Sequence, residues 1–227
     1  MQAIRVLLFL ILIITLFQAK AQTCLKDIEI DKIEQEKIRE YIGLQEEQGI
    51  CKLEDIQPSM QTNSNLKGYH IRENEYQVNK SMDDVWQYYL SSNPAKLWDG
   101  NKISFGFLYS KKQDKIFYCD QEVSKIDTGM VVYINLRLMG GLKNIATAFE
   151  FITIDSAKKI IEFSYLSGNE SLGKQRIQFY ETPKGNTRII HTSFYKSNNF
   201  PKTYFFYPYF HTRITNEFHR NIKRHLK

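Results

Sequence analysis

The chain has little cysteine. Its 227 residues include three cysteines, so at most one intramolecular disulfide can form and one thiol is left over. Cys24 and Cys51 flank a helix-prone N-terminal segment, whereas Cys119 ends the apolar run 116–119. We therefore expect a disulfide between Cys24 and Cys51. We expect Cys119 to be a buried free thiol that behaves as a small apolar side chain.

The sequence also lacks an apolar run long enough to span a membrane. The run at residues 6–17 has twelve nearly unbroken apolar residues, fewer than the roughly 18 that a span requires. Arg5 precedes this run and the small residues Ala19 and Ala21 follow it, in the order typical of a secretory signal peptide. A membrane anchor is the alternative. We expect residues 1–21 to be removed and the protein to be secreted or periplasmic.

Motifs of catalytic or metal chemistry are missing as well. The sequence has no glycine-rich phosphate loop and no Ser or Cys in a nucleophile elbow. His211 and His219 lie eight residues apart, and neither is followed at the third or fourth residue by a Cys, Asp or Glu that would complete a metal set. We expect no metal and no cofactor. His219 is predicted to be a solvated or capping side chain.

The net charge of the chain is also small. The chain has 31 basic and 25 acidic residues, and loss of Arg5 and Lys20 with the leader leaves a net charge of +4. Residues 203–227 alone carry five Lys or Arg against Glu217, and cations suit the C-terminal end of a helix. We therefore expect no nucleic-acid partner, because that would need a basic face with reading side chains.

What the sequence does contain is a long closing helix with one apolar stripe. Within Thr203 to Lys227, the residues Phe210, Ile214, Phe218 and Ile222 recur at spacings of four. The residues before it alternate in short segments joined by brief turns, which predicts antiparallel strands. The predicted strands are 69–78, 103–109, 116–123, 130–139, 145–154, 160–166, 174–180 and 187–195. We expect an α+β fold in which a curved antiparallel sheet wraps around this helix and leaves a hollow.

Two segments precede most of the sheet. Residues 24–57 are charged and helix-prone, and residues 58–67 are rich in Ser, Asn and Gln, which is typical of a linker. Ser81 is a candidate N-cap for a short helix after the first strand. We therefore divide the mature chain into a helical segment with linker over 22–67 and one main domain over 68–227.

This order of elements resembles the helix-grip superfamily, which includes START lipid-transfer domains, the major birch-pollen allergen and polyketide cyclases. The resemblance covers about residues 68–227 and implies a hollow that binds a lipid, sterol or polyketide-like molecule, or in a minority of members performs cyclase chemistry. The helical segment at 24–57 departs from the pattern and could cover the mouth of the hollow. The residues that carry the resemblance are Ser81–Trp86, Trp98–Gly100, Leu166–Ile177 and Thr187–Thr192.

Polar residues within strands and a surplus of aromatic residues define the candidate site. Glu150 and His191 interrupt apolar strands, and if they point inward they could orient a ligand or transfer a proton. Arg137 is predicted to point outward. The chain has 14 Tyr and 15 Phe, more than one helix face can bury, which favours an aromatic lining for the hollow. The predicted ligand contacts are Trp98, Phe105, Glu150, His191, Tyr207 and Phe210.

Three functions remain open. The first is an exported, monomeric binding protein that holds a hydrophobic small molecule and makes transient contact with a membrane. The second is an enzyme of cyclase or hydrolase type that uses Glu150 or His191 as acid or base. The third is a partner-binding protein whose hollow is filled by its own side chains. The missing nucleophile, metal set and phosphate loop favour the first over the second.

Overall fold

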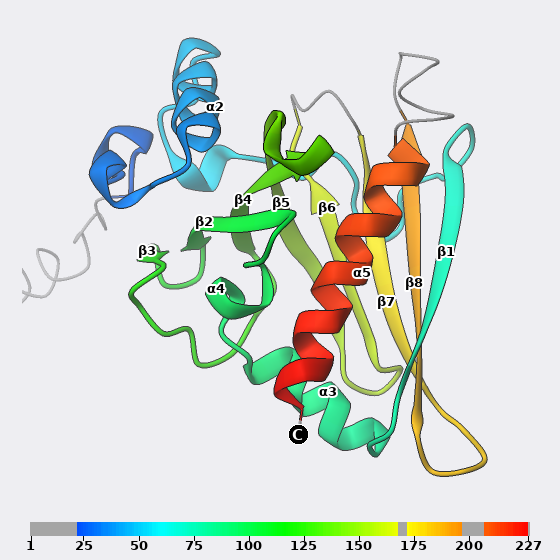
Figure 1. Cartoon of the computed structure of the whole chain (residues 1–227). Helices are drawn as coiled ribbons and strands as arrows, with labels where there is room; N and C mark the ends of the chain where they lie inside the picture. The colour runs from blue at the N-terminus through cyan, green and yellow to red at the C-terminus, as the bar shows by residue number, and fades with distance from the viewer. Residues whose placement is uncertain (1–21, 168–171, 197–206, 227) are drawn as a thin grey trace, which may run out of the picture.

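The computed structural model describes residues 22–167, 172–196 and 207–226, and its centre is one antiparallel sheet curved around a long helix (Figure 1). The sheet has eight strands in the order β1-β8-β7-β6-β5-β4-β2-β3. The strands are β1 (His70–Val78), β2 (Ile103–Ser110), β3 (Lys115–Tyr118), β4 (Met130–Leu138), β5 (Lys143–Asp155), β6 (Ile160–Tyr165), β7 (Leu172–Glu181) and β8 (Thr187–Lys196). The helices are α2 (Glu36–Glu47), α3 (Met82–Ser91), α4 (Pro94–Leu97) and α5 (Tyr207–His225), with the 3-10 helices η1 (Leu25–Asp27), η2 (Ile30–Lys32), η3 (Leu53–Asp55) and η4 (Met139–Gly141).

This arrangement confirms the predicted α+β fold. The predicted signal peptide, residues 1–21, and the first residues of the predicted closing helix, 203–206, lie outside the described residues. None of the helices in the described ranges is long and apolar enough to cross a membrane. The division of the chain at residue 67 stays a prediction.

The short helix α3 begins where its capping residue predicts. The Ser81 hydroxyl oxygen accepts a hydrogen bond from the Asp84 backbone N–H at 3.2 Å, which satisfies one of the unpaired donors of the first turn. The predicted buried side of the helix is also observed, since Val85, Trp86 and Tyr89 are all buried. In Figure 1 α3 lies across the end of the sheet where α5 ends.

Strand β3 is shorter than predicted, and this changes the position of Cys119. The strand ends at Tyr118, whose backbone N–H donates to the side-chain oxygen of Gln121 at 3.2 Å. This side-chain bond takes the place of the next strand pairing, so the chain turns away from the sheet. Cys119 is therefore exposed, and the prediction of a buried thiol is wrong.

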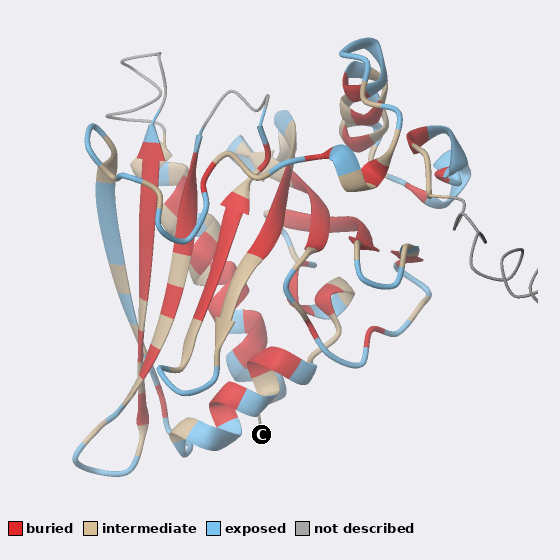
Figure 2. Cartoon of the chain, turned by 180° about the vertical axis from the view of Figure 1, so that it is seen from behind, coloured by how far each residue is buried: buried red, intermediate tan, exposed pale blue. Residues whose placement is uncertain are grey.

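The inner core lies between the concave face of the sheet and α5. Phe218 of α5 stacks on Trp98, with ring centroids 4.2 Å apart, and Ile222 is fully buried one turn later. Figure 2 shows buried positions running through the central strands, whereas the edge strand β1 is largely exposed. The burial of these large apolar side chains is the main driving force that holds α5 on the sheet.

The buried face of α5 differs from the predicted stripe. Phe218 and Ile222 are buried, but Phe210 and Ile214 are only partly buried. A helix turns about 100° per residue, so a spacing of four drifts about 40° at each step and Phe210 lies about 120° away from Ile222. The face toward the sheet instead continues through polar residues. These are His211, Thr215 and His219.

The N-terminal segment covers the opposite, convex face of the sheet. Ile38 and Ile42 of α2 are buried in a second apolar cluster that includes Phe107, Tyr133 and Ala148 from the sheet. Residues alternate between the two faces of a strand, so the neighbours of these three residues belong to the inner core. The sequence allowed this segment to cover the mouth of the hollow between the sheet and α5. The structure places it on the other face of the sheet instead.

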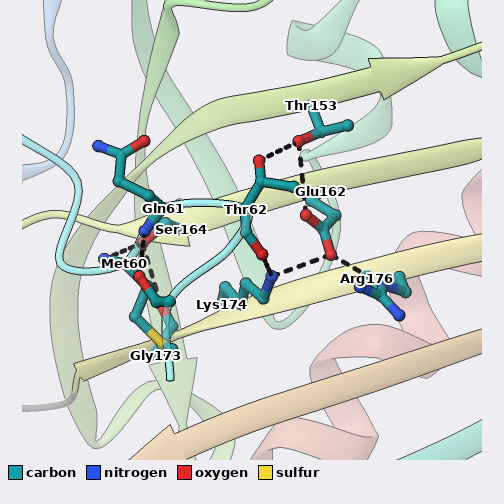
Figure 3. A network of polar contacts seen from close by, with 10 residues as sticks. Met60, Gln61, Thr62, Thr153, Glu162, Ser164, Gly173, Lys174 and Arg176 are labelled. Carbon is teal, nitrogen blue, oxygen red and sulfur yellow. Dashed lines mark hydrogen bonds and ion pairs between the residues drawn. The ribbon is translucent and has the colours of Figure 1, made fainter. Parts of the chain in front are cut away.

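Residues 57–62, which include the start of the predicted linker at 58–67, continue along this convex face, and we call them the strap. The Ser59 N–H donates to the Tyr165 carbonyl at 2.7 Å. Beneath the strap, the Lys174 ammonium donates to the Thr62 carbonyl at 2.8 Å and lies 3.1 Å from Glu162 Oε1 (Figure 3). Lys174 and Glu162 are each 1% exposed, so the strap satisfies a charge that would otherwise be costly to bury.

The structure describes all three cysteines as free thiols, so the predicted bond between Cys24 and Cys51 is not formed in it. The backbones of the two segments nevertheless meet. The Leu25 N–H donates to the Cys51 carbonyl at 3.0 Å, and Cys24 and Lys52 form an isolated antiparallel bridge. Backbone hydrogen bonds therefore join these segments without a covalent bond.

We expect Phe218→Ala to lower the free energy of unfolding by about 3–5 kcal/mol, because it removes a buried ring and leaves a cavity beside Trp98. Tyr209→Ala is the matched control, since Tyr209 is an aromatic residue of the same helix that is 51% exposed; it should change the stability by less than about 1 kcal/mol. Chemical denaturation measures both. Equal losses would show that the assignment of the buried face of α5 is wrong.

Candidate functional site

A row of hydrogen-bonded polar side chains crosses the interior between the sheet and α5. The Tyr89 hydroxyl lies 2.6 Å from His219 Nδ1, and His219 Nε2 lies 2.8 Å from His191 Nδ1. His191 Nε2 in turn lies 3.1 Å from the side-chain oxygen of Gln175. These contacts connect α3, α5, β8 and β7 in one continuous chain.

Gln175 joins this row to a second set of polar groups near the start of α5. Its side-chain oxygen also lies 2.6 Å from the Ser193 hydroxyl and 3.0 Å from His211 Nε2. Its amide nitrogen donates to the hydroxyls of Tyr165 at 3.0 Å and Tyr207 at 3.1 Å. We call the eight residues of the two sets the polar row. They are Tyr89, Tyr165, Gln175, His191, Ser193, Tyr207, His211 and His219.

The pairing of the strands brings the members of the polar row together. Gln175 pairs with Ser193, and Ile177 pairs with His191. Paired residues of antiparallel strands share a face, and Ile177 belongs to the inner core, so His191 and its neighbours at intervals of two point toward α5. His191 is 1% exposed.

One assignment of protons satisfies the path from Tyr89 to Gln175. If the Tyr89 hydroxyl donates to His219, then His219 donates from Nε2 to His191, and His191 donates from Nε2 to the oxygen of Gln175. Each histidine is then neutral, with one N–H, and each imidazole nitrogen in this path has a partner. Because buried polar groups need hydrogen-bond partners, these contacts place the N–H of both His219 and His191 on Nε2.

Burial keeps the three histidines neutral. It lowers the pKa of His219 to about 3, with Lys223 and His211 adding unfavourable charge, and it lowers the pKa of His211 to about 3, with Arg72 as the second cause. The pKa of His191 is held well below its usual range by burial and by the two other histidines. Removal from water disfavours the charged imidazolium, and nearby cations disfavour it further.

The tyrosines are shifted in the opposite sense. Burial raises the pKa of Tyr89 well above its usual range and also raises the pKa of Tyr207. All members of the row are therefore uncharged at neutral pH. The row can orient a ligand through neutral hydrogen bonds but offers it no fixed charge.

The Tyr165–Tyr207 pair leaves one donor over. The two hydroxyls lie 2.9 Å apart, and each already accepts from Gln175, so one O–H donates to the other hydroxyl. The second O–H has no acceptor among the described residues. Both tyrosines are only partly buried. The polar row therefore has one spare donor at this pair.

The structure brings two of the predicted contact residues into the polar row, namely His191 and Tyr207. Trp98 instead packs in the inner core against Phe218, Phe149 and other rings, and Phe105 is 5% exposed in the same core. Phe210 is partly buried on α5 next to Tyr209, with ring centroids 5.1 Å apart. The predicted aromatic lining near Trp98 is therefore mostly packed core.

Glu150 does not point toward α5, so its predicted role is wrong. It is buried on the convex face, where its carboxylate lies 2.7 Å from the Lys111 ammonium. The reason is alternation along β5, because Phe149 and Phe151 occupy the inner face on either side. Arg137 shares the convex face of β4 with Tyr133, so it points away from α5 as predicted. It is partly buried and donates to the Gly100 carbonyl at 2.9 Å.

A separate cleft of about 580 Å³ lies beside the C-terminal end of α5. Its wall includes Phe105, Lys96, Arg220 and Arg224. Glu217 closes one side, where its carboxylate accepts from the backbone N–H groups of Asn101 and Lys102. This cleft is polar and opens to the surface, and it is not the apolar hollow that the sequence predicts between the sheet and the closing helix.

Several members of the polar row were missed in the sequence. His219 is 2% exposed, so its prediction as a solvated side chain is wrong. A usable signal was present, since His211, Thr215 and His219 are spaced by four on the side that also includes Phe218. Gln175 and Tyr165 gave no signal, because polar residues in strands usually face solvent.

No group of three or more His, Cys, Asp or Glu side chains within the described ranges is arranged to hold a metal ion. His191 and His219 are hydrogen-bonded to each other, and His191 and His211 are each hydrogen-bonded to the side-chain oxygen of Gln175. Their nitrogens are therefore used as donors and acceptors within the protein.

The comparisons with solved structures identify the fold. Major latex-like protein 151 from Panax ginseng superimposes with a TM-score of 0.51 at 14% identity, covering 70% of this chain and 98% of that protein. The chain has the helix-grip fold. Norcoclaurine synthase from Thalictrum flavum, solved with dopamine and hydroxybenzaldehyde, gives 0.50 at 16% identity over 69% of this chain and 85% of that one. No protein-family model matches the sequence, and no curated protein matches it.

The buried histidines predict a loss of stability in mild acid. In the unfolded chain each histidine binds a proton near pH 6.5, whereas folded His211 and His219 do so only near pH 3. Stability is therefore complete above pH 6.5 and falls as the pH is lowered toward 3, by about 2 kcal/mol for each of the two by pH 5.

Denaturation curves recorded between pH 7 and pH 5 measure this effect. The variant His211→Gln should show a pH dependence that is smaller by about one proton, because it removes one group that protonates only on unfolding. A stability that does not change across this range would show that the histidines are not buried and neutral in the folded protein.

Proposed function

We propose that the protein is a binding protein for a small hydrophobic molecule that carries one oxygen acceptor. The molecule binds between the sheet and the start of α5, and its oxygen accepts a hydrogen bond from the free hydroxyl of the Tyr165–Tyr207 pair. The observation that carries the proposal is this free donor, which lies at the partly exposed end of an otherwise satisfied polar row.

The cost of burying the polar row supports a role beyond packing. An unpaired buried polar group costs roughly 1–3 kcal/mol, and apolar side chains would fill the same space without this risk. The row also connects the donor to the core through Gln175, which fixes the orientation of both tyrosines. A preorganised donor within aromatic surroundings is typical of sites that bind mostly apolar ligands in one orientation.

The chemistry of the row favours binding over acid–base catalysis. A general base works best when its pKa lies near the operating pH, yet the pKa of both His211 and His219 is lowered to about 3. Tyr207 is shifted the other way, which makes it a weaker acid. An enzyme at neutral pH would gain little from groups shifted in these directions.

The packing of the inner core limits where the ligand can lie. Trp98 and Phe218 are stacked at 4.2 Å and belong to one continuous apolar cluster, so the Trp98 end offers a ligand no room without rearrangement. Tyr165 of β6 and Tyr207 at the start of α5, by contrast, are each only partly buried. We therefore place the ligand at the start of α5 and not at the tryptophan loop.

One of the fold neighbours bears on the class of ligand. Norcoclaurine synthase was solved with dopamine and hydroxybenzaldehyde, which are small aromatic molecules with oxygen substituents. As part of this proposal, we expect the same class of ligand here. A small aromatic carbonyl or phenol fits the free donor, and it also fits the rings of Tyr195 and Tyr207, whose centroids lie 3.9 Å apart.

Export is a second part of the proposal, and it rests on the leader at residues 1–21. In an oxidising compartment Cys24 and Cys51 would be free to pair, and their segments are already joined by backbone hydrogen bonds.

The binding proposal predicts that a fluorescent aromatic ketone or aldehyde probe binds with micromolar affinity, which corresponds to about 8 kcal/mol. Tyr165→Phe and Tyr207→Phe should each weaken binding by about three- to tenfold, because one neutral hydrogen bond contributes about 0.5–1.5 kcal/mol. Fluorescence titration of the purified mature protein measures the dissociation constants.

Tyr180→Phe is the matched control. Tyr180 also lies in a strand, but its ring packs against the Arg188 guanidinium, away from the polar row. Loss of the Tyr180 hydroxyl should therefore leave binding unchanged. Absence of saturable binding by the folded protein would contradict the proposal. The same holds if all three variants bind like the parent protein.

The export proposal predicts that protein purified from its own host begins at Gln22. Sequencing of the mature N-terminus tests this, and peptide mapping without reduction tests whether Cys24 and Cys51 are linked. A mature chain that retains residues 1–21 would contradict export.

A further inference from the structure

The largest exposed apolar side chains gather at the end of the sheet where α5 begins. Seven large hydrophobic side chains are exposed among the described residues, and five of them lie at this end. We call these five the apolar rim. They are Ile71, Met139, Leu142, Leu172 and Tyr209, with exposures of 61%, 63%, 87%, 38% and 51%.

The strand registers place the rim residues at one end. Leu138 pairs with Lys143, so Met139 and Leu142 lie in the turn that joins β4 to β5. Leu172 pairs with Lys196, the last residue of β8. Figure 1 shows η4, the start of α5 and the starts of β1 and β7 at the same end of the molecule.

Leu142 is the most prominent member of the rim. It follows Gly140 and Gly141, which both have positive φ values of 71° and 95°, and it is 87% exposed. A leucine exposed to this extent at the tip of a turn gains nothing from folding. Exposed apolar side chains that cluster at one place mark interaction sites.

Cations accompany the apolar rim. Lys143 and Lys196 are exposed beside Leu142 and Leu172, and the Arg213 guanidinium lies 4.2 Å from the Tyr209 ring centroid. Arg72 of β1 is also exposed. The exposed acid next to it is Glu73, whose carboxylate accepts from the Thr192 hydroxyl at 3.0 Å. The rim is therefore apolar at its tips and basic around them.

We infer that the apolar rim docks the protein on an anionic phospholipid surface. Leu142, Met139 and Tyr209 enter the boundary between headgroups and acyl chains, while Lys143, Lys196 and Arg213 contact lipid phosphates. This combination of apolar tips and flanking cations is what binds proteins reversibly to anionic bilayers. Docking would place the Tyr165–Tyr207 pair next to the bilayer, so it deepens the proposed function by giving the source of the ligand.

The charge of the rim argues against a second copy of the chain as its occupant. Two copies that meet at this face would bring two sets of Lys143, Lys196 and Arg213 into one interface, and like charges repel. An anionic lipid surface attracts the same residues. The charge therefore selects the bilayer among apolar partners.

Cosedimentation with lipid vesicles tests the inference. The mature protein should bind phosphatidylcholine vesicles that contain about 30% phosphatidylserine, but not pure phosphatidylcholine, because each cation near an anionic surface adds about a fivefold gain in partitioning. Raising the salt to about 0.5 M should release the protein, since salt screens surface charge.

Two pairs of variants locate the contact. Leu142→Ser should lower partitioning by about tenfold, whereas Leu44→Ser on α2, where Leu44 is 52% exposed, should not change it. Lys143→Ser should lower partitioning by about fivefold. Its control is Lys184→Ser, which should not change partitioning, because Lys184 lies in the turn between β7 and β8 at the opposite end of the sheet. Circular dichroism confirms that each variant is folded.

Three results would overturn docking: no binding to anionic vesicles, equal loss in the rim variants and their controls, or a Leu142-dependent dimer in light scattering without vesicle binding. These results are separable from the proposed function. Docking fails alone if the protein binds the free aromatic probe in solution but not vesicles. The proposed function fails alone if vesicles bind and the probe does not.

Discussion

The arrangement of this protein depends on one constraint, which is that polar groups buried between the sheet and α5 need hydrogen-bond partners. His191 and Gln175 come from neighbouring strands, and His211 and His219 come from one helix. A shift of α5 by one turn along the sheet would break these hydrogen bonds. Apolar packing around Phe218 holds the helix down but is not directional. The polar row therefore fixes the register of α5, while the apolar core supplies most of the stability.

The convex face solves a different problem. A single sheet with one helix would leave that face exposed, but here α2 covers β4 and β5 with the buried residues Ile38 and Ile42. The strap continues this cover over Glu162 and Lys174, which are both buried. β2 is buried along its whole length, and its residues Phe107 and Tyr109 belong to the same convex cluster as Ile38. The convex cluster therefore supports the sheet on the side opposite α5. This support helps to keep the polar row and the tyrosine pair in a fixed geometry.

The sequence was sufficient for the fold and insufficient for most of the site. Alternation in β4 and β5 and the long final helix are local patterns, and local patterns predict elements well. The faces of residues were harder to predict. Glu150 was ambiguous because both faces of β5 are buried, so neither an apolar nor a polar neighbour showed which face is inner. His219 was misassigned because a strict spacing of four was followed along α5, although that spacing drifts around the helix. Gln175 became recognisable only when strand pairing brought it next to His191.

The neutrality of the polar row links stability to function. Groups that are kept uncharged by burial lose their arrangement if water or a proton enters, so the interior must stay closed near His191 and His219. The partly exposed pair Tyr165 and Tyr207 lies at the other end of the same row. A ligand that accepts the free hydroxyl hydrogen there completes the row and also shields it from water. Binding at this end would therefore add to the stability of the folded protein without any charge being buried, since ligands that bind only the folded state stabilise it.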